Sequence, residues 1–165
     1  MGFRSFYGHS SNVNCAKFSS YHYHIYRQNV ICSSSRDDTI RFWNFKHNRQ
    51  LQIFNEHNAG VNEIKFSPFN GGRYLCSGSL DKTIRLWDVE TSESLRVFNG
   101  HKNSVDCVDI SPLQSNDNND NKMNNINVIG GNGYTICSGS CDETIRIWDI
   151  ETAKQFNVFK GHTGY

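Results

Sequence analysis

A stretch of thirteen residues recurs along this chain and constrains its fold more than any other feature. CSGSLDKTIRLWD runs from Cys76 to Asp88, it returns as CSGSCDETIRIWD from Cys137 to Asp149, and a looser copy, CSSSRDDTIRFWN, runs from Cys32 to Asn44. The tryptophans of successive copies are 44 and 61 residues apart. Self-similarity at such a period is typical of repeat proteins, in which each unit packs against its neighbours. The chain is therefore expected to be an array of similar units.

Each unit contains four short segments that are predicted to be β-strands. The first is VNCAKFS, VNEIKFS or VDCVDIS, and in two copies it ends at a Ser-Pro pair, where proline stops the hydrogen bonding of a strand. The second runs into CSGS, the third is TIRLWD, and the fourth is SLRVFNG or its counterparts QLQIFNE and QFNVFKG. No segment shows a convincing helical period, and the regular spacing of the strands predicts an all-β architecture.

The arrangement of these units follows from their composition. A four-stranded sheet of this kind has apolar residues on both faces, which only neighbouring sheets can cover. Radial repetition around an axis covers both faces and leaves only short edges. We therefore predict a partial β-propeller built from four-stranded antiparallel blades, with repeats at residues 9–56, 57–100 and 101–161 and the start of a fourth at 162–165.

Two insertions interrupt the period. The third repeat contains residues 114–131, which are so rich in asparagine that they cannot bury a face, and we predict a flexible surface loop there. The first repeat has a shorter insertion around YHYHIYRQN. Its His22 and His24 are expected to be exposed loop residues rather than metal ligands.

Charge and cysteine content exclude several classes of protein. The 17 Lys and Arg residues nearly balance the 16 Asp and Glu residues, so no net field attracts nucleic acid or an anionic membrane. No apolar run approaches the ~18 to 20 residues that span a bilayer. Most of the six cysteines occupy equivalent strand positions, so they are expected to be small buried residues rather than disulfides or metal ligands. We expect a protein of the cytoplasm or nucleus, with no cofactor, no metal, no membrane and no nucleic acid as partner.

Each repeat also carries His, Ser, Asp and Trp in one order and at fixed places. A Ser/His/Asp set is the signature of a hydrolytic triad, but a nucleophile is needed once, whereas this set occurs three times with an indole each time. No Gly-x-Ser-x-Gly elbow presents a serine. Trp donates, Ser donates and accepts, imidazole relays and carboxylate accepts, so the four can satisfy one another in a dry interior. We therefore predict structural hydrogen-bond networks, without catalytic residues, that contain His9, Ser33, Asp37, Trp43, His57, Ser77, Asp81, Trp87, His101, Ser138, Asp142 and Trp148.

These residues resemble the signature of the WD-repeat β-propeller family: Gly-His, then Ser four residues before Asp, then Trp-Asp, at a period of 44 residues. The departures are Asn44 for the final Asp, Glu56 for Gly and Ser34 for the Gly of CSGS. The resemblance implies a non-catalytic scaffold that mediates protein–protein interactions. It also implies that proteins or peptides bind on the face of the Gly-His loop and the Asp turn. The matching candidates for partner binding are Asn12, Asn14, Arg36, Gly60, Asn62, Leu80, Ser104, Asp106 and Cys141.

Three questions stay open at the level of sequence. Propellers have four to eight blades, so we expect the chain to be a fragment of a longer protein. The alternatives are that copies of the chain assemble into one ring or that it stays an open arc. Within the scaffold role, the alternatives are a regulatory signalling subunit of the G-protein β kind and a subunit of a nuclear transcription or chromatin complex. A hydrolase that uses one Ser/His/Asp set is the alternative from another class.

Overall fold

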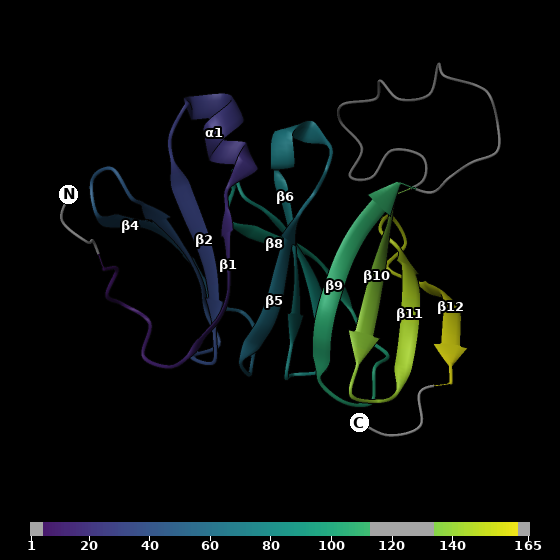
Figure 1. Cartoon of the computed structure of the whole chain (residues 1–165). Coiled ribbons are helices and arrows are strands. Elements are labelled where there is room, and N and C mark those ends of the chain that lie inside the picture. Colours follow the sequence, from purple (N-terminus) through teal and green to yellow (C-terminus); the bar gives the residue numbers. More distant parts are fainter. Residues whose placement is uncertain (1–4, 113–133, 162–165) are drawn as a thin grey trace, which may run out of the picture.

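The computed structural model describes residues 5–112 and 134–161, which form three four-stranded sheets side by side (Figure 1). Neighbouring strands within each sheet are antiparallel, and each sheet follows the order of the chain. The strands are β1 (Val13–Phe18), β2 (Val30–Ser35), β3 (Ile40–Asn44), β4 (Arg49–Phe54), β5 (Val61–Phe66), β6 (Tyr74–Ser79), β7 (Ile84–Asp88), β8 (Glu93–Phe98), β9 (Val105–Pro112), β10 (Tyr134–Ser140), β11 (Thr144–Asp149) and β12 (Gln155–Lys160). The predicted all-β architecture of four-stranded antiparallel blades is therefore confirmed. The Asn-rich loop at 114–131 and the start of a fourth repeat at 162–165 lie outside the described residues.

The turn between the second and third strands is stabilised by the same side-chain hydrogen bonds in every sheet. In the second sheet, the Asp81 carboxylate accepts hydrogen bonds from the Thr83 backbone N–H at 2.9 Å and from the Thr83 hydroxyl at 2.6 Å. Ser79 Oγ in turn accepts the Asp81 backbone N–H at 3.0 Å. Between them, Lys82 has a left-handed φ of 72°, as do the equivalent residues of the other two sheets within a few degrees. These side-chain bonds compensate for a backbone conformation that costs a non-glycine residue energy.

The hydrophobic core lies between the sheets rather than inside any one of them. One cluster, with Phe42, Phe54 and Trp87, fills the space between the first and second sheets. A second cluster, with Phe98 and Trp148, fills the space between the second and third. Each of these two tryptophans faces the preceding sheet, since Trp87 stacks on Phe54 with ring centroids 5.0 Å apart and Trp148 lies 6.0 Å from Phe98. The inner strands β1, β5 and β9 make contacts between sheets, and the other strands fan outward from them (Figure 1).

The first insertion forms a helix, so the prediction of a loop around YHYHIYRQN is wrong. Helix α1 (Ser20–Tyr26) begins after Ser19, whose Oγ lies 2.8 Å from His22 Nδ1, and it packs against the short 3-10 helix η1 (Asn70–Gly72). His22 is buried, which corrects the expected exposure and lowers the pKa of the imidazole, whereas His24 is exposed as expected. A helix of one or two turns is stabilised mainly by packing, here of Tyr21 in the first core cluster, and therefore leaves little periodic signal.

The cysteines are free, and their burial differs between repeats. Cys32 and Cys76 are fully buried, as predicted, but Cys137 is half-buried and Cys107 is exposed, which corrects the prediction for those strands. Cys107 and Cys137 belong to the third sheet, on the side that no further described sheet covers. Within the described residues, no helix is long and apolar enough to cross a membrane, and no group of His, Cys, Asp and Glu could hold a metal ion.

Candidate functional site

The four residues of each predicted network come together in the structure. In the second sheet, the Trp87 indole N–H donates to Ser77 Oγ at 2.8 Å, Ser77 Oγ lies 2.7 Å from His57 Nε2, and His57 Nδ1 lies 2.7 Å from Asp81 Oδ2. The same three contacts recur in the first and third sheets at 2.7 to 2.9 Å. The network ties the second and third strands to the loop before the first strand.

Hydrogen bonds keep the network carboxylates ionised. Burial by itself raises the pKa of Asp81, but hydrogen bonds from His57, the Thr83 hydroxyl and the Asn58 backbone N–H outweigh burial and hold that pKa well below its ordinary value. The equivalent aspartates of the first and third sheets show the same balance. For His101, burial lowers the pKa against the raising effect of its hydrogen bond to the carboxylate, so the imidazole is neutral at pH 7.

In the third sheet, this charge state fixes the direction of every bond in the network. An ionised carboxylate only accepts hydrogen bonds, so the imidazole Nδ1 carries the proton and Nε2 accepts from the serine hydroxyl. The serine oxygen then accepts from the indole, which can only donate. Each donor of this sheet therefore has one acceptor, from Trp148 through Ser138 and His101 to Asp142.

The network shares the connectivity of a hydrolytic triad but differs from one at the serine. The Trp87 indole already engages a lone pair of Ser77 Oγ, the atom that a nucleophile would use for attack. Ser77 is also fully buried, and Ser138 is nearly so, because the neighbouring sheet covers each of them. The arrangement is therefore suited to holding strands and loops together rather than to reaching a substrate.

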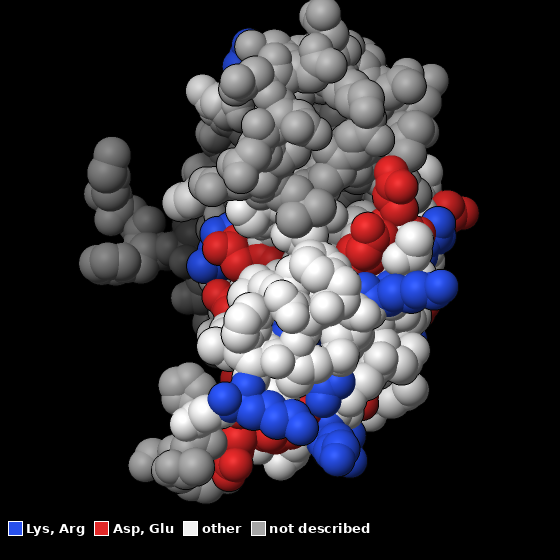
Figure 2. All heavy atoms as spheres, turned by 90° about the vertical axis from the view of Figure 1, so that its right-hand side faces the viewer, with Lys and Arg blue, Asp and Glu red and all other residues white. Residues whose placement is uncertain are grey.

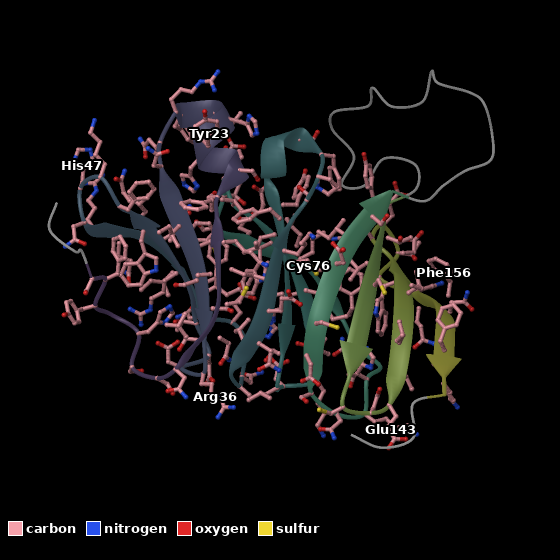
Figure 3. All side chains as sticks on the ribbon, in the orientation of Figure 1. Tyr23, Arg36, His47, Cys76, Glu143 and Phe156 are labelled. Carbon is pink, nitrogen blue, oxygen red and sulfur yellow. The ribbon has the colours of Figure 1, made fainter. Side chains whose placement is uncertain are left out.

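Each network anchors two loops at one end of its sheet. The histidine lies in the loop before the first strand, and the aspartate lies in the turn between the second and third strands. We call the surface that these segments form the loop end; it comprises residues 8–12, 36–39, 56–60, 80–83, 100–104 and 141–143. Arg36 and Glu143 lie at this end, at the bottom of Figure 3, and Tyr23 of α1 lies at the opposite end.

One backbone hydrogen bond joins the two loops in every sheet. The N–H of Arg36 donates to the Asn12 carbonyl at 2.9 Å, and the N–H of Leu80 donates to the Gly60 carbonyl at 2.9 Å. In the third sheet the corresponding donor is Cys141, at 3.1 Å from the Ser104 carbonyl. With the histidine–aspartate contact beside it, this bond makes each pair of loops a fixed unit on a rigid scaffold.

Of the residues expected to bind a partner, some present their side chains at the loop end and others do not. Asn12, Arg36 and Leu80 are exposed there, and Cys141 is half-buried. The Cys141 thiol donates at 2.9 Å to Oδ2 of Asp106, an exposed residue of β9 beside the loop end. Gly60 and Ser104 are buried, and their role in partner binding stays a prediction. A Cβ added at Gly60 would lie 3.0 Å from the Arg36 Cα and 3.1 Å from Leu80 Cδ1, so Gly60 lets those two residues approach each other.

Asn14 and Asn62, two further residues predicted to bind a partner, make hydrogen bonds between sheets. Asn14 Nδ2 donates to the Val61 carbonyl, and Asn62 Nδ2 donates to the Val105 carbonyl, at 3.0 Å each. Each amide thus spans from one inner strand to the next. We call these two contacts the amide struts.

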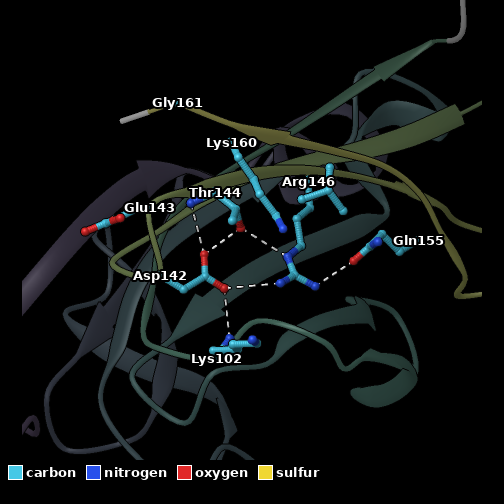
Figure 4. A pocket seen from close by; sticks show the side chains of 9 residues that line it. Lys102, Asp142, Glu143, Thr144, Arg146, Gln155, Lys160 and Gly161 are labelled. Carbon is cyan, nitrogen blue, oxygen red and sulfur yellow. Dashed lines mark hydrogen bonds and ion pairs between the residues drawn. The ribbon is translucent and has the colours of Figure 1, made fainter. Parts of the chain in front are cut away.

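Sequence reasoning missed two members of the network, the Thr and Arg of TIR. In the third sheet, the Thr144 hydroxyl donates to Asp142 Oδ1, and Arg146 donates to Thr144 Oγ1 at 3.1 Å, to Asp142 Oδ2 at 3.3 Å and to Gln155 Oε1 at 2.6 Å (Figure 4). These residues line a hollow of about 530 Å³ whose wall also includes Lys102. Thr and Arg recur at these positions in all three copies, and that recurrence is the signal that could have found them.

The second sheet departs from this pattern because Glu56 replaces glycine before the histidine. Arg85 Nη1 pairs with Glu56 Oε2 at 2.7 Å and with Ser94 Oγ at 3.1 Å, and Arg85 Nε is left buried without a hydrogen-bond partner among the described residues. The substitution noted in the sequence therefore redirects one arginine while the network beside it stays intact.

Packed four-stranded sheets with a Trp–Ser–His–Asp network in each define the blades of a β-propeller. The family model described as "WD domain, G-beta repeat" matches the chain at residues 3–44, 48–88 and 92–149. The chain belongs to this WD40 family, whose repeats generally mediate protein–protein interactions. Comparison with curated proteins gives no match.

Proposed function

We propose that this chain is a non-catalytic scaffold of the cytoplasm or nucleus that binds a protein or peptide at the loop end. The observation that carries the proposal is that Arg36 and Leu80 both lie against Gly60. They belong to two adjacent loops, each fixed by a backbone hydrogen bond, and so place a cation beside an apolar side chain. Both side chains are exposed. Arginine is one of the residue types that dominate binding energy, and a preorganised surface lowers the entropy cost of binding.

The two special cases expected from the sequence are forms of this role. A regulatory signalling subunit of the G-protein β kind and a subunit of a nuclear transcription or chromatin complex would both use such a surface, and the identity of the partner separates them. Self-association, an alternative that the sequence leaves open, would use the outer sheet faces and not the loop end.

A selection of displayed random peptides against the purified chain tests the proposal, with affinities then measured by fluorescence anisotropy. Peptides that bind should lose at least about tenfold in affinity to Leu80→Ser and to Arg36→Ala, because each removes one anchor. Tyr23→Ser is the matched control, since Tyr23 is also exposed but lies on α1 at the other end. Binding that survives both loop-end variants, or that Tyr23→Ser weakens equally, would contradict the proposed site.

A further inference from the structure

Arg85 and Arg146 hold equivalent positions on β7 and β11, but the residues that approach them from the preceding loop differ. In the second sheet, Glu56 of that loop places its carboxylate oxygen 2.7 Å from Arg85 Nη1. In the third sheet, Gly100 stands at the position of Glu56 and provides no side chain. A Cβ added at Gly100 would lie 3.0 Å from Arg146 Nη1, so a side chain at this position would point at the arginine. The loop therefore supplies a carboxylate to the arginine of the second sheet and none to the arginine of the third.

The hollow of about 530 Å³ in the third sheet lies against this arginine. Its wall includes Arg146 and Gln155, two of the side chains that a Cβ on Gly100 would approach. Arg146 lies two residues before Trp148 on β11, so by strand alternation both side chains are on the same side of the sheet. Trp148 packs toward Phe98 of the second sheet. The hollow therefore lies on the side of the third sheet that faces the second sheet.

Two lysines add positive charge to the hollow of the third sheet. Lys102 and Lys160 both line it, and the side chain of Lys160 runs toward Arg146 (Figure 4). The first two repeats have uncharged residues at the same two positions: Ser10, Asn58, Asn55 and Asn99. Figure 2, which faces the β12 side of the molecule, shows Lys and Arg side chains gathered toward its lower edge, where the loop end lies. The third sheet therefore has three cations at positions where each of the other two sheets has one.

Two carboxylates, Asp142 and Glu143, also line the hollow. Both oxygens of Asp142 already accept hydrogen bonds, Oδ1 from the Thr144 hydroxyl and Oδ2 from Arg146. The Glu143 side chain is directed away from Arg146 (Figure 4). A guanidinium has five N–H groups, and the hydrogen bonds of Arg146 within the described residues use one each on Nε, Nη1 and Nη2. Each Nη therefore keeps a second N–H that can donate to an anion in the hollow.

We propose that this hollow binds a carboxylate side chain of an acidic peptide, which takes on Arg146 the place that Glu56 takes on Arg85. A carboxylate accepts strong, charge-assisted hydrogen bonds from a guanidinium, and the two lysines attract neighbouring acidic residues of the same peptide. The volume of the hollow lies within the range of about 300 to 1,000 Å³ that is usual for ligand pockets. The inference rests on the proposed function in that the ligand is a peptide, but it uses neither Arg36 nor Leu80.

Fluorescence anisotropy of a fluorescein-labelled hexaglutamate peptide, titrated with the whole chain, tests the proposal. A salt concentration of about 0.1 M limits unspecific attraction, because the Debye length is then about 10 Å. Lys160→Glu and Lys102→Glu each reverse an exposed charge of the hollow and should weaken binding about tenfold. Lys154→Glu is the matched control, since Lys154 is also exposed but lies just before the other end of β12, about 20 Å along the strand. It should change the affinity by less than about twofold.

Arg146→Lys separates a site on the arginine from a general attraction between charges. The change keeps the positive charge but removes the planar fork of donors, so hexaglutamate should bind about fivefold more weakly although the net charge is the same. Arg146 also donates to Thr144 and Asp142, so circular dichroism must first show that the variant is folded. If it is not, Lys102→Glu and Lys160→Glu decide, because both lysines are exposed and their replacement leaves the network intact.

Leu80→Ser distinguishes a failure of this site from a failure of the proposed function. It leaves the hollow unchanged, so it should not alter the affinity for hexaglutamate. Binding that is lost in Leu80→Ser but kept in Lys160→Glu would overturn the hollow while supporting the loop-end anchors. The absence of hexaglutamate binding, or an equal loss in Lys154→Glu, would also overturn the hollow. Equal binding of a thymidine hexanucleotide would overturn the acidic peptide as ligand, because it would show a general attraction to polyanions.

Discussion

Ser77→Ala removes the central hydroxyl of the best-covered network. The change leaves the Trp87 indole N–H without its acceptor and His57 Nε2 without its hydrogen-bond partner. Trp87 and His57 are 1% and 4% exposed, so water cannot replace the hydroxyl. An unpaired buried polar group costs about 1 to 3 kcal/mol, so two such groups, with some relaxation, should lower the free energy of unfolding by about 2 to 4 kcal/mol.

Two serines of the first sheet, Ser33 and Ser34, are matched controls for this prediction. Ser34 Oγ is buried with no hydrogen-bond partner among the described residues, so Ser34→Ala should be neutral or slightly stabilising. Ser33 makes the same network bonds as Ser77, but it lines a hollow of about 410 Å³ beside Phe6 and Trp43, where water can enter. Ser33→Ala should therefore cost about 1 kcal/mol or less.

Urea unfolding followed by circular dichroism and by tryptophan fluorescence provides the measurement. All variants must be compared at one concentration at which the oligomeric state is known, because association adds to apparent stability. The expected order of destabilisation is Ser77→Ala, then Ser33→Ala, then Ser34→Ala. If Ser77→Ala costs no more than Ser34→Ala, the network does not stabilise the fold. If Ser77→Ala leaves stability unchanged but abolishes hydrolysis of an ester substrate, the triad alternative holds instead.

Three further predictions follow from the turns, the carboxylates and the thiols. The three network aspartates have depressed pKa values in the folded state, so their stabilisation is present above about pH 4 and is lost as the pH falls, with a slope approaching about 4 kcal/mol per pH unit. Asp81→Asn should reduce that slope by about a third in urea melts at acid pH, and an unchanged slope would count against the assignment. Gly72→Ala should cost more than about 1 kcal/mol, because φ is +82° and a Cβ would strike α1. Gly71 also has a positive φ, +61°, but a Cβ there would make only an ordinary contact with His24 Cβ at 3.6 Å, so Gly71→Ala should cost less; equal costs would refute the clash at Gly72. An aromatic disulfide reagent should label exposed Cys107 quickly and Cys76, whose pKa burial raises, only on unfolding; prompt labelling of Cys76 would contradict its burial.

The repeat predicted most of the fold, because the same strand and turn residues recur in each of the three units. Alternating residues such as Ile84 and Leu86 give the strands, and the Ser–Asp–Thr turn closes each hairpin by side-chain hydrogen bonds that need no distant partner. Helix α1 escaped prediction because its stability comes from Tyr21 in a core that a different segment of the chain completes.

The sequence predicted which residues form the network, but it did not predict which of the neighbouring side chains face solvent. Because Trp87, Ser77, His57 and Asp81 recur at fixed places in each repeat, they were predicted to form one network, and hydrogen bonds join them in the structure. Recurrence could not separate a side chain that faces solvent from one that spans two sheets, so Asn62 was expected at a binding surface although it donates to the next inner strand.

Val13, Val61 and Val105 separate the properties that the sequence determines from those that the tertiary structure determines. The sequence by itself determined the residue type, the strand and the repeat position, which are the same for all three. The assembly of the sheets decided that the first is 54% exposed and that the other two are buried. The physical reason is that strand and turn formation depend on local bonds and alternation, whereas burial depends on whether a neighbouring sheet lies against the face.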